Sequence, residues 1–191
     1  MNMLCLMRHG ETDANKKLIV QGRINNPLNE TGKIQAQQAS KFLINAHENF
    51  DMIVSSPLVR ALETANIIAL AYGLNQQVLI WPDFTERDFG DFDGRVIDNE
   101  YAKRVVFDEI PHMEKNHDLE NRIKNGLTAL CQAYPNRKIL IVAHSHVIKA
   151  LLVNLLPGFT YTSYLFNCSL NYLKYEDGKY SVIAHNVNPL L

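Results

Sequence analysis

The apolar residues of the chain fall into two kinds of pattern. Short continuous runs, such as 3–7 and 138–143, are typical of strands that are buried on both faces of a sheet. Longer segments, such as 32–46, carry apolar residues at helical spacing and predict helices. Because the two kinds alternate along the chain, the pattern favours an α/β fold with a mostly parallel sheet and helices on both faces.

The same pattern predicts the order of the elements. We expect strands at 3–7, 51–55, 78–81, 138–143, 170–175 and 180–184, and helices at 32–46, 56–72, 118–133 and 146–156. Residues 95–117 are irregular apart from a helical pattern at 101–107. Ser56 and Pro57 are expected to begin the second helix, with the hydroxyl as its cap and the proline in its first turn. The Asp-Gly pair at 177–178 predicts a tight hairpin, which requires an antiparallel neighbour in the sheet.

The composition excludes several classes of protein. The chain has 191 residues, 47% of them hydrophobic and 20% charged, which is the balance of a soluble globular domain. A net charge of -1 argues against a general nucleic-acid or membrane surface, and no apolar stretch reaches the roughly 20 residues of a membrane span. Cys5, Cys131 and Cys168 lack metal-ligand spacing and are expected to be reduced thiols. We therefore expect a cytoplasmic monomer or homodimer without nucleic-acid or membrane partners.

Polar clusters follow four of the expected strands, at the point where each strand ends. The clusters are Arg8–His9, Ser55–Arg60, Glu86–Gly90 and Ala143–His146. The carboxyl ends of parallel strands meet at one edge of the sheet, where α/β proteins bind their ligands. We therefore expect two histidines, at least two arginines and one carboxylate to meet in one anion-binding pocket.

This set of side chains favours a phosphoryl group as the ligand. A carboxylate needs one arginine, whereas a phosphoryl group in transfer spreads its charge over three oxygens and needs several donors. His9 can attack phosphorus to form a phosphohistidine, and Glu86 can protonate the departing oxygen if its pKa is raised. Arg60 would lie in the first turn of a helix, whose amino end also attracts anions. His144 and His146 lack a third ligand nearby in the sequence, so no metal is expected.

Several motifs extend these clusters and occur in a fixed order along the chain. They are Leu6–Asn15, Gln21–Arg23, Pro27–Gly32, Ser55–Ala65, Glu86–Gly94 and Val142–His144. Together they resemble the histidine phosphatase superfamily, which contains cofactor-dependent phosphoglycerate mutases and many small phosphatases. The resemblance implies a three-layer α/β sandwich with one antiparallel edge strand, as a single domain over 1–191 with a short lid at 95–117. It implies chemistry without a metal or other cofactor.

The resemblance also implies roles for individual residues. His9 would be the phosphorylated nucleophile and Glu86 the proton donor. Arg8, Arg60 and His144 would bind the phosphoryl group. The remaining residues expected to bind phosphate or substrate are Asn15, Gln21, Gly22, Arg87 and Ser145.

Three positions depart from the pattern of the family. Ser145 stands where a glycine is usual, and its side chain either crowds the pocket or adds a hydroxyl donor. Asn25 replaces a common aspartate, which removes one charge from a loop. Residues 116–120 replace a Gly-Glu-Ser stretch, which removes a possible substrate contact. The nucleophile, the acid and the phosphate-binding residues all remain, so we expect an active enzyme.

The segment 95–117 favours a phosphatase over a mutase. A mutase must exclude water and hold a bisphosphate, which requires a large lid and extra cations. This segment is short and carries four positive against five negative side chains. We therefore expect a metal-independent phosphatase that hydrolyses a small phosphate monoester through a phosphohistidine at His9. The alternatives, in order, are a cofactor-dependent phosphoglycerate mutase, whose class uses the position of Arg87, and a non-catalytic phosphate-binding domain.

Overall fold

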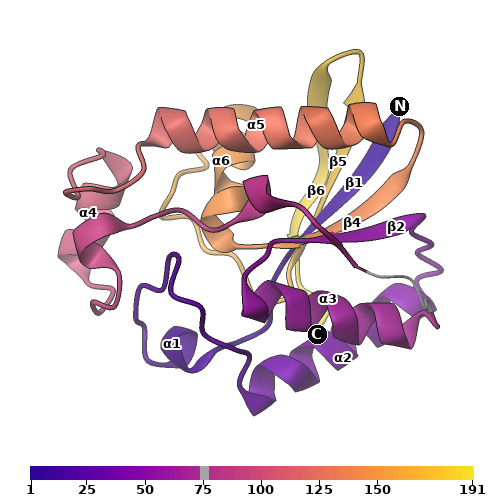
Figure 1. The fold of residues 1–191 in the computed structure, drawn as a ribbon, viewed down its shortest axis with the longest axis horizontal. Helices are drawn as coiled ribbons and strands as arrows, with labels where there is room; N and C mark the ends of the chain where they lie inside the picture. The colour runs from indigo at the N-terminus through magenta and orange to yellow at the C-terminus, as the bar shows by residue number, and fades with distance from the viewer. Residues whose placement is uncertain (74–77) are drawn as a thin grey trace.

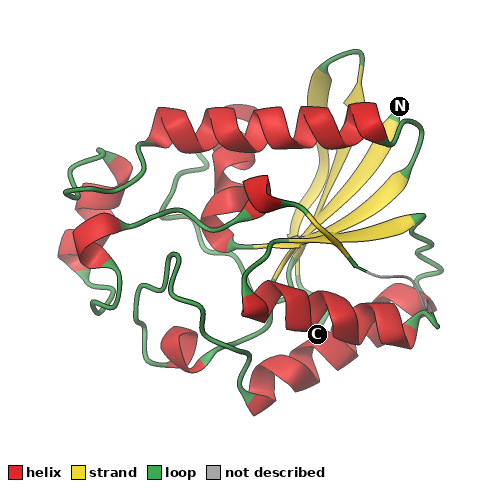
Figure 2. Cartoon of the chain, in the orientation of Figure 1, coloured by secondary structure: helices red, strands yellow, loops and turns green. Residues whose placement is uncertain are grey.

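The computed structural model describes residues 1–73 and 78–191. In chain order the elements are β1 (Asn2–Arg8), α1 (Asp13–Lys16), α2 (Glu30–Asn45), β2 (Met52–Ser55), α3 (Val59–Ala71), β3 (Leu79–Ile80), the 3-10 turns η1 (Pro82–Phe84) and η2 (Gly90–Phe92), α4 (Asn99–Val106), α5 (Asn116–Ala133), β4 (Lys138–Ala143), α6 (Ser145–Leu155), β5 (Leu170–Glu176) and β6 (Lys179–Val187). Figure 2 shows one central sheet between two groups of helices.

The six strands of the sheet lie in the order β3-β2-β4-β1-β5-β6. β2 pairs in parallel with β3 and β4, and β4 pairs in parallel with β1. β5 runs antiparallel to β1, and β6 pairs antiparallel with β5 at the edge. Asp177 and Gly178 close this hairpin with positive φ angles of 50° and 77°, which suit a tight two-residue turn. The predicted α/β fold, mostly parallel with an antiparallel edge, is confirmed.

The two faces of the sheet are covered by different helices. Leu4 and Leu6 of β1 pack in the core beneath α5 and α6, whereas Cys5 and Met7 pack on the opposite face against α2 and α3. Successive residues of a strand point to opposite faces, so a strand covered on both sides needs a continuous apolar run. Figure 1 shows α5 and α6 on one side of the sheet and α2 and α3 on the other. This arrangement gives the expected three layers.

The segment 95–117 packs at the end of the sheet where the parallel strands finish. Its helix α4 lies at that end of the molecule in Figure 1, away from the amino terminus. A small separate core fixes it there, formed by Val20, Phe89, Phe92, Val105, Ile110 and Met113. Ile19 and Val96 also form an isolated antiparallel bridge. The segment is therefore anchored both to the main body and to the loop after α1.

The start of α3 differs from the prediction. The helix begins at Val59, and its Ncap residue Leu58 makes no side-chain capping bond, so the expectation that Ser56 caps it is wrong. Instead, the Asn25 side chain accepts a hydrogen bond from the Val59 backbone N–H at 2.7 Å. Because Asn25 comes from a distant loop, no local pattern predicts this cap. The Ser56 hydroxyl accepts a hydrogen bond from the Leu58 backbone N–H at 3.3 Å and makes one further contact, described below. Pro57 precedes the Ncap residue, so the expectation that it lies in the first turn is also wrong.

No helix in the described part of the chain is long and apolar enough to cross a membrane.

Candidate active site

The structure brings together the polar clusters that follow the parallel strands. His9 follows β1, Arg60 lies in the first turn of α3 after β2, Glu86 comes after β3, and His144 follows β4. Arg8, His9, Arg60 and Glu86 line one cavity of about 410 Å³. The His144 ring lies directly beside that of His9, with the two ring centroids 5.2 Å apart. The carboxyl ends of the strands thus form the site, as the sequence predicted.

His9 is held as a neutral ring whose Nε2 carries the lone pair. Its side chain is buried, and Nδ1 lies 2.7 Å from the Gly10 carbonyl oxygen. A carbonyl can only accept a hydrogen bond, so Nδ1 carries the proton and Nε2 carries the lone pair. Burial, followed by the nearby charges of Arg60 and Arg8, holds the pKa of His9 well below its usual range. The Nε2 atom is therefore available as a nucleophile at neutral pH.

Arg60 is a fully buried cation with fixed orientation. Its Nε donates to Nε2 of His9 at 3.2 Å, and its two terminal nitrogens donate to the carbonyls of Ile24 and Gly22 at 2.8 Å each. Within the described residues it forms no ion pair with a carboxylate. Burial lowers its pKa to about 10, so the group stays positive at neutral pH. Its charge is therefore directed at the nucleophile and not neutralised locally.

Two further polar atoms near His9 are buried without a partner. They are Nε of Arg8 and Nδ1 of His144, for which the described residues supply no hydrogen bond. The other end of each side chain is fixed: Arg8 donates to the Leu165 carbonyl at 2.6 Å, and Nε2 of His144 lies 2.7 Å from the Ser56 hydroxyl. Unpaired buried polar atoms are costly in a folded protein, so such atoms point to a bound ligand. An anion between them would be a suitable partner.

Glu86 has the properties of a proton donor. Its carboxylate is buried and is held by the backbone N–H groups of Arg87 at 2.8 Å and His146 at 3.3 Å. Burial raises the pKa of Glu86, although these hydrogen bonds and the Arg60 charge act in the opposite direction. A raised pKa keeps a larger fraction of the carboxyl protonated near neutral pH. Such a carboxyl can donate a proton and later accept one.

Most of the other predicted binding residues also line the cavity. Asn15, Gln21, Gly22 and Ser145 are all part of its wall. Gly22 lies so close to the chain that an added Cβ would sit 2.7 Å from the Arg87 carbonyl oxygen, which explains why only glycine fits there. The structure therefore brings these four residues into the same cavity as His9, and their contact with a ligand stays a prediction.

Two of the predicted binding residues, His144 and Arg87, are not part of the cavity wall. His144 lies beside His9, as described above, whereas Arg87 is engaged elsewhere. Its side chain is completely buried outside the cavity wall, where it pairs with Asp108 at 2.9 Å and donates to the Glu114 carbonyl at 2.8 Å. The guanidinium also lies 5.1 Å from the centroid of the Tyr161 ring and 3.5 Å from Nδ1 of His146, so Arg87 contacts two residues of the cavity wall without being part of it. The expectation that Arg87 contacts substrate is therefore not supported by its position.

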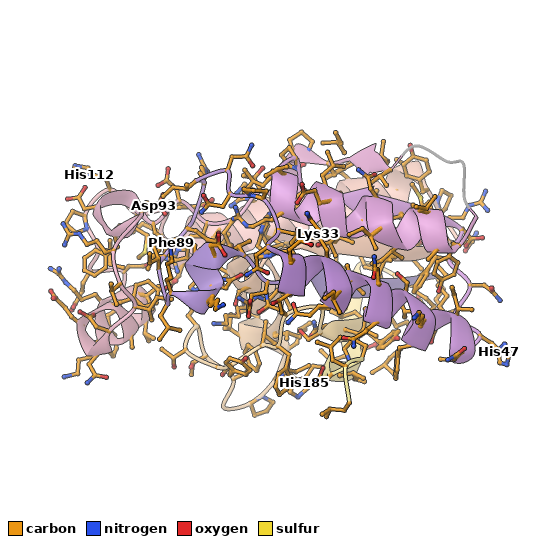
Figure 3. All side chains as sticks on the ribbon, turned by 90° about the horizontal axis from the view of Figure 1, so that it is seen from below. Lys33, His47, Phe89, Asp93, His112 and His185 are labelled. Carbon is orange, nitrogen blue, oxygen red and sulfur yellow. The ribbon has the colours of Figure 1, made fainter. Side chains whose placement is uncertain are left out.

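The sequence did not single out several residues that line the outer part of the cavity. These are the aromatic residues Tyr161 and Tyr164, together with Lys149, Thr162, Ser163 and Asn167. Phe89 and His146, which belong to the polar clusters named from the sequence, also line the cavity. A signal was present only for Lys149, which is the sole Lys, Arg, Asp or Glu residue of the largely apolar α6. The histidines outside the site are exposed, and Figure 3 shows His47 and His112 at opposite ends of the molecule and His185 at its periphery.

Among the residues that the structure describes, no group of three or more His, Cys, Asp or Glu side chains is arranged to hold a metal ion.

Comparisons with known proteins agree on one family. A profile described as "Histidine phosphatase superfamily (branch 1)" matches residues 4–188. An uncharacterised phosphatase of Bacillus subtilis is 38% identical over 190 residues, which cover 98% of this chain and 96% of that protein. A probable phosphoglycerate mutase of Cronobacter sakazakii is 30% identical over 187 residues, covering 90% of this chain and 84% of the relative.

A solved structure shares the whole fold. The phosphoserine phosphatase of Entamoeba histolytica, in complex with phosphoserine, superimposes with a TM-score of 0.85 at 25% identity and covers 100% of both chains. The extent of these matches, together with the order of the motifs and the geometry of the site, leads to one conclusion. The chain belongs to branch 1 of the histidine phosphatase superfamily.

Proposed function

We propose that this protein is a cytoplasmic phosphatase that hydrolyses small phosphate monoesters through a phosphohistidine at His9. The observation that carries the proposal is the neutral His9 ring, whose Nε2 lone pair faces the fixed guanidinium of Arg60. The unpaired atoms of Arg8 and His144 beside it supply the further donors that a phosphoryl group needs. Three buried, free cysteines support a reducing compartment.

In the first step, Nε2 of His9 attacks phosphorus in line with the ester oxygen. The P–N bond forms as the P–O bond to the alcohol breaks, and Glu86 gives its proton to the departing oxygen. Arg8, Arg60 and His144 donate to the phosphoryl oxygens, whose negative charge is greatest in the transition state. The Gly10 carbonyl accepts from Nδ1 and stabilises the positive charge that the ring acquires.

In the second step, water replaces the alcohol. Glu86, now a carboxylate, takes one proton from the water molecule while the water oxygen attacks phosphorus. The P–N bond breaks, inorganic phosphate leaves, and His9 recovers its lone pair. Glu86 is protonated again, so one residue serves as acid and then as base.

The segment 95–117 supports hydrolysis over the mutase alternative. Its residues Ile97, Tyr101 and Ala102 reach the cavity, so we assign it the role of a short lid. The lid brings no cation to the cavity wall, and Arg87 is engaged by Asp108. Apart from the arginines beside His9, the cavity wall in the described chain holds one cation, Lys149, which by itself supplies too few donors for a second phosphate. Water would therefore resolve the phosphoenzyme.

The experiment is phosphate release from p-nitrophenyl phosphate and a panel of monoesters, with excess chelator present. We expect the wild type to release phosphate and His9→Ala to release none, because the variant lacks the nucleophile that accepts the phosphoryl group. His47→Ala, which changes an exposed histidine far from the site, is the matched control and should keep full activity. Chelator-sensitive turnover, or turnover by His9→Ala, would refute the mechanism. Transfer to 3-phosphoglycerate without phosphate release would favour the mutase.

A further inference from the structure

Lys149 is a buried cation that the proposed reaction does not use. It lies on α6, where the rest of the helix carries no charged residue, and its side chain is 8% exposed. It lines the same cavity as His9. Burying an ammonium group is costly, whereas an apolar side chain of similar volume would suit an apolar helix. We therefore expect the lysine at this position to bind a ligand.

The ammonium group has only one hydrogen-bond partner in the described chain. Its Nζ donates to the Tyr161 carbonyl at 2.7 Å. It forms no ion pair with any carboxylate of the described residues. A protonated lysine has three N–H donors, so two remain for a ligand in the cavity. Lys149 can therefore donate two further hydrogen bonds to a ligand.

The surroundings of Lys149 form a polar corner in a largely apolar outer cavity. Ser145 lies one helical turn earlier on α6, and Thr162 and Ser163 follow Tyr161; all line the cavity. The apolar residues Leu18, Ile19, Val20 and Ile97 line the same cavity. The remaining cations of the cavity wall, Arg8 and Arg60, lie beside the nucleophile. Lys149 bonds to neither of these arginines; its one partner, the Tyr161 carbonyl, belongs to the 161–165 part of the cavity wall, so we assign Lys149 to the alcohol part of the substrate.

We propose that Lys149 selects phosphate monoesters whose alcohol part carries a carboxylate, by donating to that carboxylate. This inference rests on the proposed function and names its substrate class. One ammonium group with neighbouring hydroxyls matches a carboxylate, because a second phosphate requires more donors. The substrate is then a phosphorylated hydroxy acid of small size.

The test uses two esters that differ at one group. 3-Phosphoglycerate carries a carboxylate where glycerol 3-phosphate carries a hydroxymethyl group. We expect the wild type to have a kcat/KM at least about tenfold higher for the acid, the worth of a hydrogen bond to a charged group. Lys149→Met should bring the ratio of the two values close to one. Lys124→Met, at an exposed position of α5, is the matched control and should keep the ratio.

Each outcome bears on the proposal. A wild type without preference for the acid overturns it. A Lys149→Met variant that loses activity on both esters equally also overturns it, because the lysine would then serve only to hold the loop through Tyr161. Calorimetric affinities of the inactive His9→Ala variant for the two esters provide a readout without turnover. If these affinities depend on Lys149 while the wild type hydrolyses neither ester, the proposed function fails and the carboxylate site stands.

The preference should also depend on pH. Burial and the Arg8 charge lower the pKa of Lys149 to about 7. The titratable and charged groups that surround it are Arg8 on β1, Glu86 after β3, His146 on α6 and Tyr161 in the following loop. Because an ammonium group is positive below its pKa, the preference for the acid should fall as pH rises through about 7. Changes in Glu86 affect both esters and cancel in the ratio; a constant ratio would contradict the proposal.

Discussion

The two ends of the cavity are built in different ways. The inner end is formed by Arg8, His9, Arg60 and Glu86, with the His144 ring directly beside His9. Arg8 ends β1, His9 and His144 follow β1 and β4, Arg60 lies in the first turn of α3, and Glu86 lies between η1 and η2. Each is fixed by hydrogen bonds to the backbone or to a neighbouring side chain. The outer end, formed by Leu18–Val20, Ile97–Ala102, Lys149 and Tyr161–Leu165, comes from loops, the lid and one lysine on α6.

This difference separates chemistry from selectivity. Strand ends are held by the sheet and so keep several groups within a small distance of one phosphorus atom, as transition-state stabilisation requires. Loops tolerate substitution and insertion, so they can change the fit to the alcohol without disturbing that geometry. Changes at the inner end should therefore affect all substrates, whereas changes at the outer end should affect the ranking of substrates.

The largest effect should come from Glu86→Gln, because it removes the proton donor. We expect kcat to fall by about 1,000-fold or more for alkyl phosphates, whose alkoxide must be protonated. The loss should be far smaller for p-nitrophenyl phosphate, whose phenolate leaves without a proton. Steady-state rates on both esters test this, with the exposed Glu109→Gln as control. Equal losses on both esters would argue against Glu86 as the acid.

Arg60→Ala should come next, and it should affect good and poor leaving groups alike. The guanidinium stabilises the phosphoryl charge, which is common to all substrates, so we expect a loss on the order of 3 kcal/mol in kcat/KM. Arg60→Lys keeps the charge but lacks the planar fork, so it should restore only part of the rate. The exposed Arg137→Ala controls for loss of positive charge. Thermal unfolding separates this effect from loss of the contacts to Ile24 and Gly22. A loss confined to poor leaving groups would reject the assignment.

A smaller effect is expected in the dependence of kcat/KM on pH. His9 must be neutral to attack, and its lowered pKa keeps it neutral below the ordinary value of 6.5. Glu86 must be protonated, and its raised pKa keeps a protonated fraction above the ordinary value of 4.5. We therefore expect kcat/KM for an alkyl ester to be highest on the acid side of neutrality and to fall as pH rises. The fall should disappear in Glu86→Gln; an alkaline optimum in the wild type would contradict both assignments.

Ser145→Gly should have the smallest effect. Ser145 is the first residue of α6 and lies at the boundary between the two ends of the cavity. Glycine costs at most about 1 kcal/mol of stability in a helix, and no step of the chemistry uses the hydroxyl. Rates on p-nitrophenyl phosphate should stay close to those of the wild type, while the ratio between the acid and neutral esters shifts slightly. A large gain in rate on p-nitrophenyl phosphate would show that Ser145 crowds the inner end.

The same contrast explains which features the sequence could predict. The runs at 3–7 and 138–143 predicted β1 and β4 because a strand covered on both faces must be apolar throughout. Once these strands were placed, the residues after them identified the inner end.

Contacts between distant loops could not be predicted in this way. Asn25 caps α3 from a loop, Asp108 forms an ion pair with Arg87, and Lys149 donates a hydrogen bond to the Tyr161 carbonyl. Each contact depends on the path of a connecting segment, which has no periodic pattern to indicate it.

The most direct test of the central claim is detection of the phosphoenzyme. The wild type is mixed briefly with an excess of ester and quenched in alkali, since phosphohistidine is labile in acid, and its peptides are then analysed by mass spectrometry. We predict one added phosphoryl group on the peptide that contains His9, formed and lost at rates that match turnover. Turnover without this adduct, or with the phosphoryl group on His144 or His146, would contradict the account.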